Sequence, residues 1–536
     1  MLTACLLAFA ATAFAQTPYV SKVWVADNGN GTYTNPIIYA DYSDPDVCRA
    51  GDDYWMTASS FVHSPGLPIL HSKDMVNWTI VNHALPRLVP HEVFNTPQPG
   101  WGVWAPAIRY HNNEFYIYWG DPDFGIYMVK TADPRGRWSD PVLVKAGKGL
   151  IDACPLWDDD GRAYVVHAYA GSRAGVKSVL AIFEMTPDGT KAITESRLVF
   201  DGHDGNDTVE GAKFHKHDGY YWIFAPAGGV KPGWQLAMRS KEIYGPYEAR
   251  KILAQGNAPF NGPHQGAWVD TPSGEHWFYN FQDVGPVGRL VHLQPLNWVN
   301  GWPVAGIDAD GDGCGEPVVT HRKPNVGGTY PIQTPQENDE FDGLTLGLQW
   351  QWQANYQPIW AYFAGDKGYM RLFSIFEPEN RVYGNLFDVP NMVMQKFPAP
   401  DFSAVTKVTF TPNVVGERAG FIVFGRSYAM LALENTKDGL VLSQVECKDA
   451  DRKGKETVRA SQPVNGNTFY LKVTVKEGNK CTFSFSENGR RYTQLGNEFL
   501  SREGVWVGSK VGYFTTAPRG GAYGGWMDVD WFRIEK

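Results

Sequence analysis

Along the first two thirds of the chain, hydrophobic residues recur in short aromatic-rich runs, each of which follows a polar turn. The runs are "GDDYWMTAS" near Tyr54, "HNNEFYIYW" near Tyr116, "DDGRAYVVHAY" near Tyr164, "HDGYYWIFAP" near Tyr221 and "SGEHWFYNF" near Trp277. No long segment carries apolar residues at the i, i+3, i+4, i+7 positions of an amphipathic helix, so the pattern predicts strands. Successive runs are about 50 to 60 residues apart, enough for four short strands and their turns.

Five such units predict a five-bladed β-propeller over residues 30–325, with an irregular β-sandwich as the alternative that the pattern leaves open. The pattern changes at "KPNVGGTYPIQTPQENDEFDG", a segment of Pro, Gly and polar residues in which we place a linker, residues 326–338. Alternating strands separated by turns such as "ENG" and "KDG" follow it. They predict an antiparallel β-sandwich of the jelly-roll type over residues 339–536. The expected fold class is therefore all-β.

The N-terminus, "MLTACLLAFAATAFAQ", has an apolar run that ends in Ala13-Phe14-Ala15. A small residue on each side of one variable position is typical of a signal-peptide cleavage site. Residues 1–15 are thus predicted to be removed on export to the periplasm or the extracellular space. "LTAC" resembles the lipid-attachment box of bacterial lipoproteins and leaves anchoring by lipid as an alternative. The run is too short for a membrane-spanning helix, and no other segment is apolar enough.

Composition and charge narrow the classes of partner. Aromatic residues make up 14% of the chain, and aromatic faces pack both on sugar rings and in β-sheet cores. The net charge of −9 argues against nucleic acid and anionic membranes as partners. Five cysteines follow the predicted cleavage site, without a CxxC pair or regular spacing, so neither a zinc site nor a disulfide framework is predicted. Pairing of Cys447 with Cys481 stays open, whereas Cys48, Cys154 and Cys314 are expected to be small buried residues.

Three acidic motifs lie near the starts of predicted strands in different blades. Asp44 belongs to "YSDPDVCR", Asp152 to "GLIDACPLW" and Glu210 to "DTVEGAKF". Because each precedes a strand of its own blade, all three can point into one central channel. Hydrolysis of a glycosidic bond needs two carboxyl groups, and a third nearby raises the pKa of the proton donor. The alternative for Asp44 and Asp46, on either side of Pro45, is an ordinary turn.

Residues 35–325 resemble the family 43 glycoside hydrolases. The matching runs include "YSDPDVCRAGDDYWMTASSF", "PGLPILHSKDMVNW", "GLIDACPLWDDDGRAYV", "VEGAKFHKHDGYYWIFAPAGG" and "GRLVHLQPLNW", in family order. The resemblance implies that Asp44 is the general base, Glu210 the general acid and Asp152 the acid that modulates the pKa of Glu210 and orients it. Asp46 is then structural. The family inverts anomeric configuration, so base and acid are expected roughly 6.5–9.5 Å apart.

The same resemblance implies binding residues around these acids. Arg289 would hydrogen-bond the terminal sugar, and Phe61 and Trp104 would shape its pocket. His264 of "GPHQGAW" would contact a structural calcium ion through that ion's water shell, while the chemistry itself needs no cofactor. The alternatives are a surface arginine, two core aromatics and a core histidine. From about Asp339, the chain resembles the sandwich of β-xylosidase-type members, in which a loop closes one side of the pocket.

A separate acidic run, "GIDADGDGCGEPV", matches only the start of a calcium-binding loop. Asp308, Asp310 and Asp312 have the required spacing, but Val319 stands where the loop needs glutamate, and no helix follows. We therefore predict a tight Asp/Gly turn there.

The function expected from the sequence is an exo-acting, inverting glycoside hydrolase on hemicellulose oligosaccharides. α-L-Arabinofuranose is the favoured terminal sugar, because "SSFVHSPG" departs from the "STFEWFPG" run of dedicated xylosidases. A β-D-xylosidase or bifunctional enzyme is the alternative. A carbohydrate-binding protein without activity is a different class, which predicts that one of the three acids would be missing. The sequence does not fix the oligomeric state.

Overall fold

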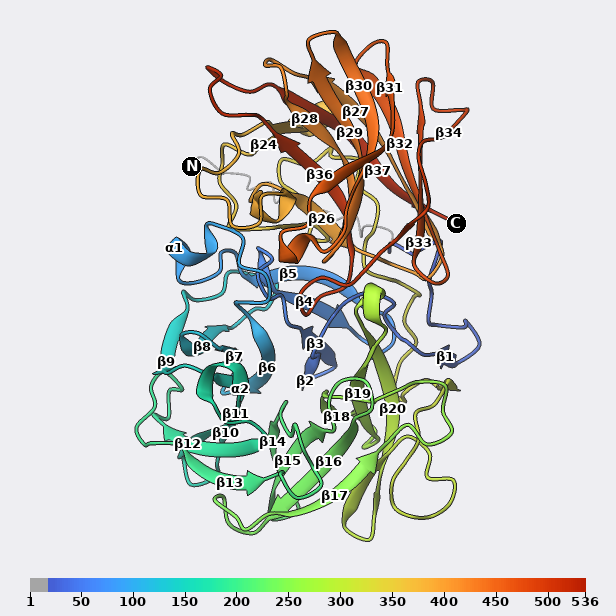
Figure 1. Cartoon of the computed structure of the whole chain (residues 1–536). Coiled ribbons are helices and arrows are strands. Elements are labelled where there is room, and N and C mark those ends of the chain that lie inside the picture. Colours follow the sequence, from blue (N-terminus) through green and yellow to red (C-terminus); the bar gives the residue numbers. More distant parts are fainter. Residues whose placement is uncertain (1–17) are drawn as a thin grey trace, which may run out of the picture.

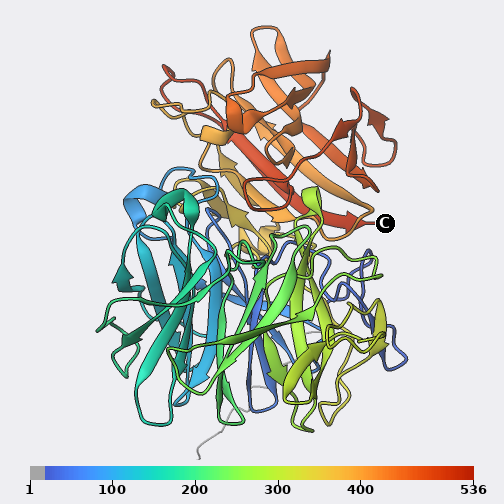
Figure 2. The same ribbon diagram turned by 60° about the horizontal axis from the view of Figure 1, so that its bottom comes forward.

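The computed structural model describes residues 18–536 and consists of a β-propeller with a β-sandwich stacked on one of its ends (Figure 1). The turned view in Figure 2 shows the sandwich, residues coloured from yellow to red, lying across that end. The predicted all-β fold class is confirmed. The predicted signal peptide, residues 1–15, lies outside the described residues.

Each of the five blades is a four-stranded antiparallel sheet whose strands pair in sequence order. The first two blades are β2–β5 (Asp46–Ala50, Asp53–Thr57, Gly66–Ser72, Thr79–Leu85) and β6–β9 (Trp104–His111, Glu114–Asp121, Gly125–Thr131, Val142–Ala146). The third and fourth are β10–β13 (Leu150–Trp157, Ala163–Tyr169, Val179–Met185, Arg197–Asp201) and β14–β17 (Lys213–His217, Tyr220–Ala227, Trp234–Ser240, Glu248–Leu253). The fifth is β18–β21 (Trp268–Asp270, His276–Asp283, Arg289–Val299, Trp302–Ala305). β1 (Thr32–Thr34) pairs with β22 (Thr320–Arg322) beside them.

The five aromatic runs of the sequence form the second strand of each blade. Tyr54, Tyr164 and Trp277 are less than 2% exposed and fill the spaces between neighbouring sheets. Much of the aromatic content of the first domain therefore serves the core, where large flat side chains pack well between twisted sheets. The helices are single turns, α1 (His91–Phe94), α2 (Gly171–Ala174) and the 3-10 turns η1 (Gly285–Val287), η2 (Gly365–Lys367), η3 (Leu386–Asp388) and η4 (Ala450–Arg452).

The sandwich packs a seven-stranded sheet on an eight-stranded one. The first contains β23 (Gln351–Trp352), β26 (Val393–Lys396), β36 (Lys510–Thr516), β28 (Arg418–Phe424), β29 (Tyr428–Thr436), β30 (Gly439–Cys447) and β31 (Glu456–Pro463). The second contains β24 (Ala361–Phe363), β25 (Met370–Phe373), β37 (Trp526–Glu535), β27 (Phe402–Thr411), β32 (Thr468–Lys476), β33 (Lys480–Ser486), β34 (Thr493–Gln494) and β35 (Phe499–Leu500). In β32 buried and solvent-facing residues alternate, the signature of a sheet with one face in the core.

The sandwich core continues into the propeller. Val287 and Leu290 of the fifth blade belong to the same buried cluster as the inward side chains of the sandwich. Hydrogen bonds also cross the seam, since Ser64 and Trp352 exchange two backbone bonds of 3.1 and 2.6 Å. Asn355 is fully buried, and its side chain accepts from the backbone of Leu88 and donates back to it. One buried apolar cluster and these hydrogen bonds therefore join the two domains.

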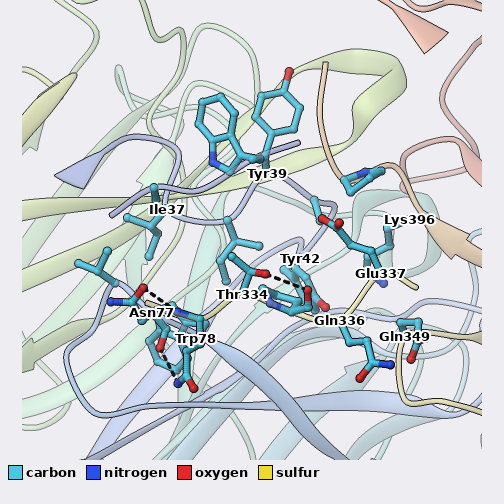
Figure 3. Close-up of a pocket in the computed structure, with 18 of the residues that line it drawn as sticks. Ile37, Tyr39, Tyr42, Asn77, Trp78, Thr334, Gln336, Glu337, Gln349 and Lys396 are labelled. Carbon is cyan, nitrogen blue, oxygen red and sulfur yellow. Dashed lines mark hydrogen bonds between the residues drawn. The ribbon is translucent and has the colours of Figure 1, made fainter. Parts of the chain in front are cut away.

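The connecting segment lies against the propeller (Figure 3). The backbone amide of Gln333 donates to Asn77, and that of Thr334 to the carbonyl of Tyr19. Glu337 accepts hydrogen bonds from the hydroxyls of Tyr19 and Ser21, and burial raises the pKa of Glu337 to about 7. A cavity of about 50 Å³ remains between this segment and the two domains.

All five cysteines of the described residues are free. Cys447 lies in β30 and Cys481 in β33, which belong to different sheets, so the disulfide that the sequence left open does not form. Cys48 and Cys154 are buried as expected, but Cys314 is only half-buried, because it lies in an exposed turn. Within residues 18–536 no helix has the length and apolar character needed to cross a membrane.

Candidate active site

The backbone bends in the same way where the innermost strand of each blade begins. In each blade a residue within three positions of that start has a positive φ, among them Asp44 (53°), Ala105 (37°), Asp152 (59°), Gly211 (61°) and Gln265 (36°). Four of the five are not glycine, and such residues adopt this conformation at an energetic cost that often marks a functional site. The repeated bend brings residues far apart in sequence to one end of the propeller axis, the end that faces the sandwich.

Asp44 is fixed by three donors. Its Oδ2 accepts from the hydroxyls of Ser43 and Ser59, both at 2.6 Å, and its Oδ1 lies 3.0 Å from Nη1 of Arg289. The oxygen of Ser59 in turn accepts the backbone amide of Ala105 at 2.8 Å, which ties the first blade to the second. Asp44 is 5% exposed. Its carboxylate is thus held in one orientation at the floor of the site.

Asp46, on the other side of Pro45, lies away from the site. Its Oδ2 accepts from the backbone of Ile108 and from Nη1 of Arg109, both at 2.7 Å, and the residue is fully buried. The same guanidinium reaches the thiol sulfur of Cys154 at 2.9 Å through Nη2. Asp46 therefore joins three blades through a buried ion pair, whereas Asp44 faces the pocket.

Asp152 and Glu210 form an electrostatically coupled pair. Oδ2 of Asp152 accepts the backbone amide of Gly211, the neighbour of Glu210, at 2.6 Å. Burial, followed by the charge of Glu210 and then that of Asp44, raises the pKa of Asp152 to about 8. Glu210 keeps 31% of its side chain exposed toward the pocket. Asp152 therefore holds a proton into the neutral range, beside the more exposed carboxyl of Glu210.

The acids line one small pocket that both domains build. Asp44, Asp152, Glu210, Arg289, Phe61 and Trp104 all border it, together with Ala105, Ile151, Val230, Gln265 and Trp506. Its volume is about 100 Å³. This is far below the roughly 300–1,000 Å³ of sites for drug-sized ligands, and suits a single sugar ring.

Phe61, Trp104 and Trp506 form an aromatic wall. The centroids of Phe61 and Trp104 lie 6.1 Å apart, as do those of Trp104 and Trp506, in edge-to-face contacts. Trp506 comes from the sandwich loop between β35 and β36, has a φ of 66° and is 47% exposed. A half-exposed tryptophan at the rim of a polar pocket offers an apolar face to a sugar.

Arg289 and Gln265 offer free donors to a ligand. Nη1 of Arg289 binds Ser43 and Asp44, while its Nη2 makes no hydrogen bond within residues 18–536. The guanidinium lies 4.8 Å from the ring centroid of Phe281 and 5.9 Å from that of Trp506, positions suited to cation–π attraction. The amide nitrogen of Gln265 is buried and also without a partner in the described chain. Buried donors without partners are costly, and a sugar hydroxyl can satisfy them.

His264 lies beside Glu210 but supplies few ligands for calcium. Its Nε2 is 3.7 Å from Oε1 of Glu210, and neither ring nitrogen has a hydrogen-bond partner in the described residues. Calcium takes roughly six to eight oxygen ligands, and one imidazole with one carboxylate falls far short of that set. Direct coordination therefore does not fit these residues, and contact through a water shell stays a prediction.

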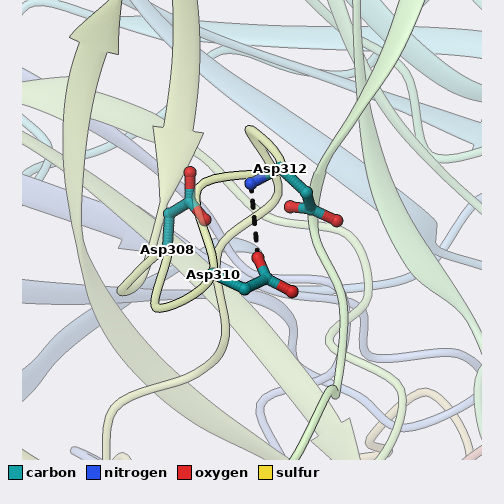
Figure 4. Close-up of side chains that lie close together, drawn as sticks. All are labelled: Asp308, Asp310 and Asp312. Carbon is teal, nitrogen blue, oxygen red and sulfur yellow. Dashed lines mark hydrogen bonds between the residues drawn. The ribbon is translucent and has the colours of Figure 1, made fainter.

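The Asp308, Asp310 and Asp312 side chains do gather in one turn (Figure 4). Asp308 accepts the backbone amides of Gly311 and Gly313, and Asp310 and Asp312 accept those of Asp312 and Cys314. These carboxylates hold the chain in a tight loop between β21 and β22, the structure predicted from the Asp/Gly pattern. The turn does not border the pocket that holds Asp44, Asp152 and Glu210.

Sequence reasoning missed five pocket residues, of which Gln265 and Trp506 can contact a sugar through an amide or an aromatic face; the others are Ala105, Ile151 and Val230. Gln265 had a usable signal, since it lies just before its blade's first strand, as Asp44 and Glu210 do. Trp506 had none, because "EGVWVGSK" reads as an ordinary loop and lies about 220 residues beyond the last propeller residue of the pocket.

Comparison with known proteins agrees with this geometry. The family model described as glycosyl hydrolases family 43 matches residues 33–303, and that of the beta xylosidase C-terminal concanavalin A-like domain matches residues 338–535. A beta-xylosidase of Formosa agariphila is 32% identical over 563 residues, covering 95% of this chain and 91% of that protein. A non-reducing end alpha-L-arabinofuranosidase of Bacteroides ovatus is 28% identical, covering 94% of each chain.

Among solved structures, a mutant of a GH43 protein from Bacillus licheniformis superposes with a TM-score of 0.80 at 28% identity, covering 94% of this chain and 99% of that one. Fold, pocket and family models agree over nearly the whole described length. The chain is a member of glycoside hydrolase family 43.

Proposed function

We propose that this enzyme is an exo-acting, inverting glycosidase that removes one terminal pentose from a hemicellulose oligosaccharide. Asp44 is the general base, Glu210 the general acid and Asp152 the residue that positions the proton on Glu210. The main support for this proposal is that these three acids line one small pocket. Protonation and water activation are both done by carboxyl groups, so the reaction uses no cofactor.

The contacts of each acid suit its proposed step. Asp44 is held by Ser43, Ser59 and Arg289, which orient it to accept a proton from an attacking water. Glu210 is the more exposed acid and can reach the leaving oxygen. Its proton passes to that oxygen as the glycosidic bond breaks, while Asp44 takes the proton of the water that bonds to the anomeric carbon. Configuration is thereby inverted.

The shape of the pocket supports action at chain ends. A space of about 100 Å³, with Trp506 and Trp104 along its rim, admits a terminal sugar and excludes a continuous polysaccharide. Binding energy from this wall and from Nη2 of Arg289 would place the anomeric carbon between base and acid. The N-terminal pattern supports export, which would bring the enzyme to oligosaccharides outside the cytoplasm.

The terminal sugar is proposed to be β-D-xylose, with α-L-arabinofuranose as the second candidate. The relative named beta-xylosidase is more similar than the one named arabinofuranosidase, at 32% against 28% identity, and the sandwich matches a model named for beta xylosidases. The run "SSFVHSPG", which contains Phe61, is the feature that favours arabinofuranose. The two sugars place similar hydroxyls in a pocket of this kind, so both deserve direct measurement.

The test compares kcat/KM on an aryl β-D-xyloside and an aryl α-L-arabinofuranoside with the same leaving group. We expect the xyloside to be the better substrate by about tenfold, the size of a one-contact difference in a sugar pocket. An arabinofuranoside preference of similar size would reverse the order of the two candidates. Absence of hydrolysis on both, with folded protein, would contradict the assignment to a pentosidase.

Asp152→Asn should move the alkaline limb of the pH–rate profile to lower pH by about one unit or more. Asp152 keeps its proton up to about pH 8 because burial and then the charge of Glu210 resist its loss. In the variant no second carboxyl shares a proton with the acid, so activity is expected to fall earlier as pH rises. An unmoved limb would remove Asp152 from this role.

The same variant should unfold at a higher temperature than wild type at pH 8. A carboxyl whose pKa is raised on folding stabilises the protein at low pH, and that contribution is lost as pH rises toward about 8. Asparagine does not ionise, so the variant does not lose stability in this way as pH rises. A more stable but less active protein with a shifted pH profile distinguishes a role in positioning the proton from damage to the fold.

A further inference from the structure

A second hollow in the propeller lies at the end of its axis opposite the catalytic pocket. The last residues of the innermost strands β6, β10, β14 and β18 border it, together with His276 of β19. Asp152 borders the catalytic pocket and Trp157 the second hollow, and they are five residues apart in β10, roughly 16 Å along the strand. The sandwich lies across the other end of the propeller (Figure 2), so no domain of residues 18–536 covers this hollow. We call it the far hollow.

The far hollow is larger than the catalytic pocket. Its volume is about 500 Å³, against about 100 Å³ for the pocket that holds Asp44 and Glu210. Sites for small ligands usually measure roughly 300–1,000 Å³. The far hollow therefore has room for more than one sugar ring, whereas the catalytic pocket suits a single ring.

Flat aromatic side chains line the far hollow. His111 and Trp157 stack face to face, with ring centroids 4.5 Å apart and an angle of 8° between the ring planes. Trp268 packs against His217, with ring centroids 5.1 Å apart. Both tryptophans keep part of their surface exposed, and Tyr110 is 42% exposed. Partly exposed rings of this kind suit the apolar C–H faces of sugars.

The charged side chains of the lining already have partners of opposite charge. The ion pairs are Arg109 with Asp46 (2.7 Å), Asp270 with Arg49 (2.7 Å), and Lys216 with both Asp159 (2.8 Å) and Asp158. Charged ligands are selected by complementary charge, and a charged ligand here would have to compete with an existing ion pair. The lining therefore favours an uncharged ligand.

The histidines of the lining offer hydrogen bonds without charge. Burial lowers the pKa of His215 and of His276, so both rings are neutral at pH 7. Nδ1 of His276 accepts from the indole nitrogen of Trp268 at 3.2 Å, which leaves the ring proton on Nε2, where it donates to no group of residues 18–536. Nε2 of His215 is buried and also has no partner in that part of the chain. A neutral imidazole donates one hydrogen bond and accepts another, and a sugar hydroxyl can do the same.

We propose that the far hollow is a second carbohydrate-binding site, which holds an uncharged segment of a hemicellulose chain away from the end that reacts. The choice of hemicellulose rests on the proposed function, whereas the preference for an uncharged ligand with flat apolar faces rests on the lining itself. The two sites lie at opposite ends of the propeller, so one short oligosaccharide cannot occupy both. A bound polymer would instead keep its other chain ends near the catalytic pocket, which raises their effective concentration.

The binding test uses native gels that contain soluble arabinoxylan, with dextran gels as the reference. The full chain carries Glu210→Gln so that the polymer is not degraded during the run. We expect arabinoxylan to retard this chain. Adding Tyr110→Ala or Trp268→Ala should raise the apparent Kd about fivefold, the effect of losing one aromatic contact. Retardation that neither substitution changes, or no retardation of the Glu210→Gln chain itself, would overturn the proposal.

The matched control is Tyr523→Ala, the same change as Tyr110→Ala at a sandwich residue that is 65% exposed and does not border the far hollow. It should leave the apparent Kd within about twofold of that of the Glu210→Gln chain. The thermal unfolding midpoint of each variant separates loss of binding from damage to the fold.

Kinetics of the chain with Glu210 intact give a second readout. The ratio of kcat/KM on arabinoxylan to kcat/KM on the better aryl glycoside should fall about fivefold in Tyr110→Ala and stay within about twofold in Tyr523→Ala. An unchanged ratio in Tyr110→Ala would contradict a role of the far hollow in polymer hydrolysis. Failure to hydrolyse either aryl glycoside would contradict the proposed pentosidase, whereas the gels test the second site by itself.

Discussion

Replacing Glu210 by glutamine is expected to lower kcat/KM on a natural oligosaccharide by about 10³-fold, within the range attributed to a positioned general acid. The amide keeps the size of the side chain and its place beside His264 but cannot give a proton to the leaving oxygen. An aryl glycoside with an acidic phenol needs little protonation, so its loss should be about tenfold or less. The measurement is the ratio of the loss in kcat/KM on the oligosaccharide to the loss on the aryl glycoside. This ratio isolates proton donation, because only the oligosaccharide depends strongly on it.

The matched control is Glu195→Gln, the same chemical change at a carboxylate whose side chain is 99% exposed. It should leave both substrates within about twofold of wild type, because surface substitutions of this kind have small effects. Equal losses on both substrate types in Glu210→Gln would count against the assignment of this residue as the acid. They would instead favour a role in binding.

Removing the sandwich is expected to abolish soluble, active protein. A chain that ends before Asp339 would expose Val287 and Leu290, which are 4% and 2% exposed in the intact structure. It would also lose the backbone bonds of Ser64 to the sandwich. An exposed apolar face of this kind favours aggregation. Expression, solubility and kcat/KM of the truncated chain are the measurements. A soluble fragment ending at Thr334 with full exo activity would show that the sandwich is only an accessory.

Trp506→Ala tests whether the aromatic wall binds the sugar, independently of any effect on the stability of the fold. Trp506 is 47% exposed and packs edge-to-face on Trp104, so its removal should change the unfolding temperature little. The expected result is a KM raised about tenfold with a smaller change in kcat, since a wall that contacts the sugar equally before and during reaction contributes uniform binding. An unchanged KM would mean that the sandwich supports the propeller without touching the substrate.

The sequence by itself determined the repeating architecture and the likeness of its acidic motifs to one family. The five aromatic runs lie in the second strands of the five blades because strand preference and alternation are local properties. The positions of Asp44 and Glu210 before their strands could be read in the same way, whereas Asp152, predicted to precede its strand, is the third residue of β10. The repeat implied that they share an axis, and the structure places all three around one pocket.

Only the tertiary structure decided which distant groups meet. Trp506 reaches a pocket built by residues of the first 290 positions, and Lys396 meets Lys510 across a ladder that joins strands more than 100 residues apart. The pKa of Asp152 depends on burial and on the charges of Glu210 and Asp44, three residues from three blades. Local pattern carries strand and turn preference, whereas long-range contacts, desolvation and charge balance depend on how the whole chain packs.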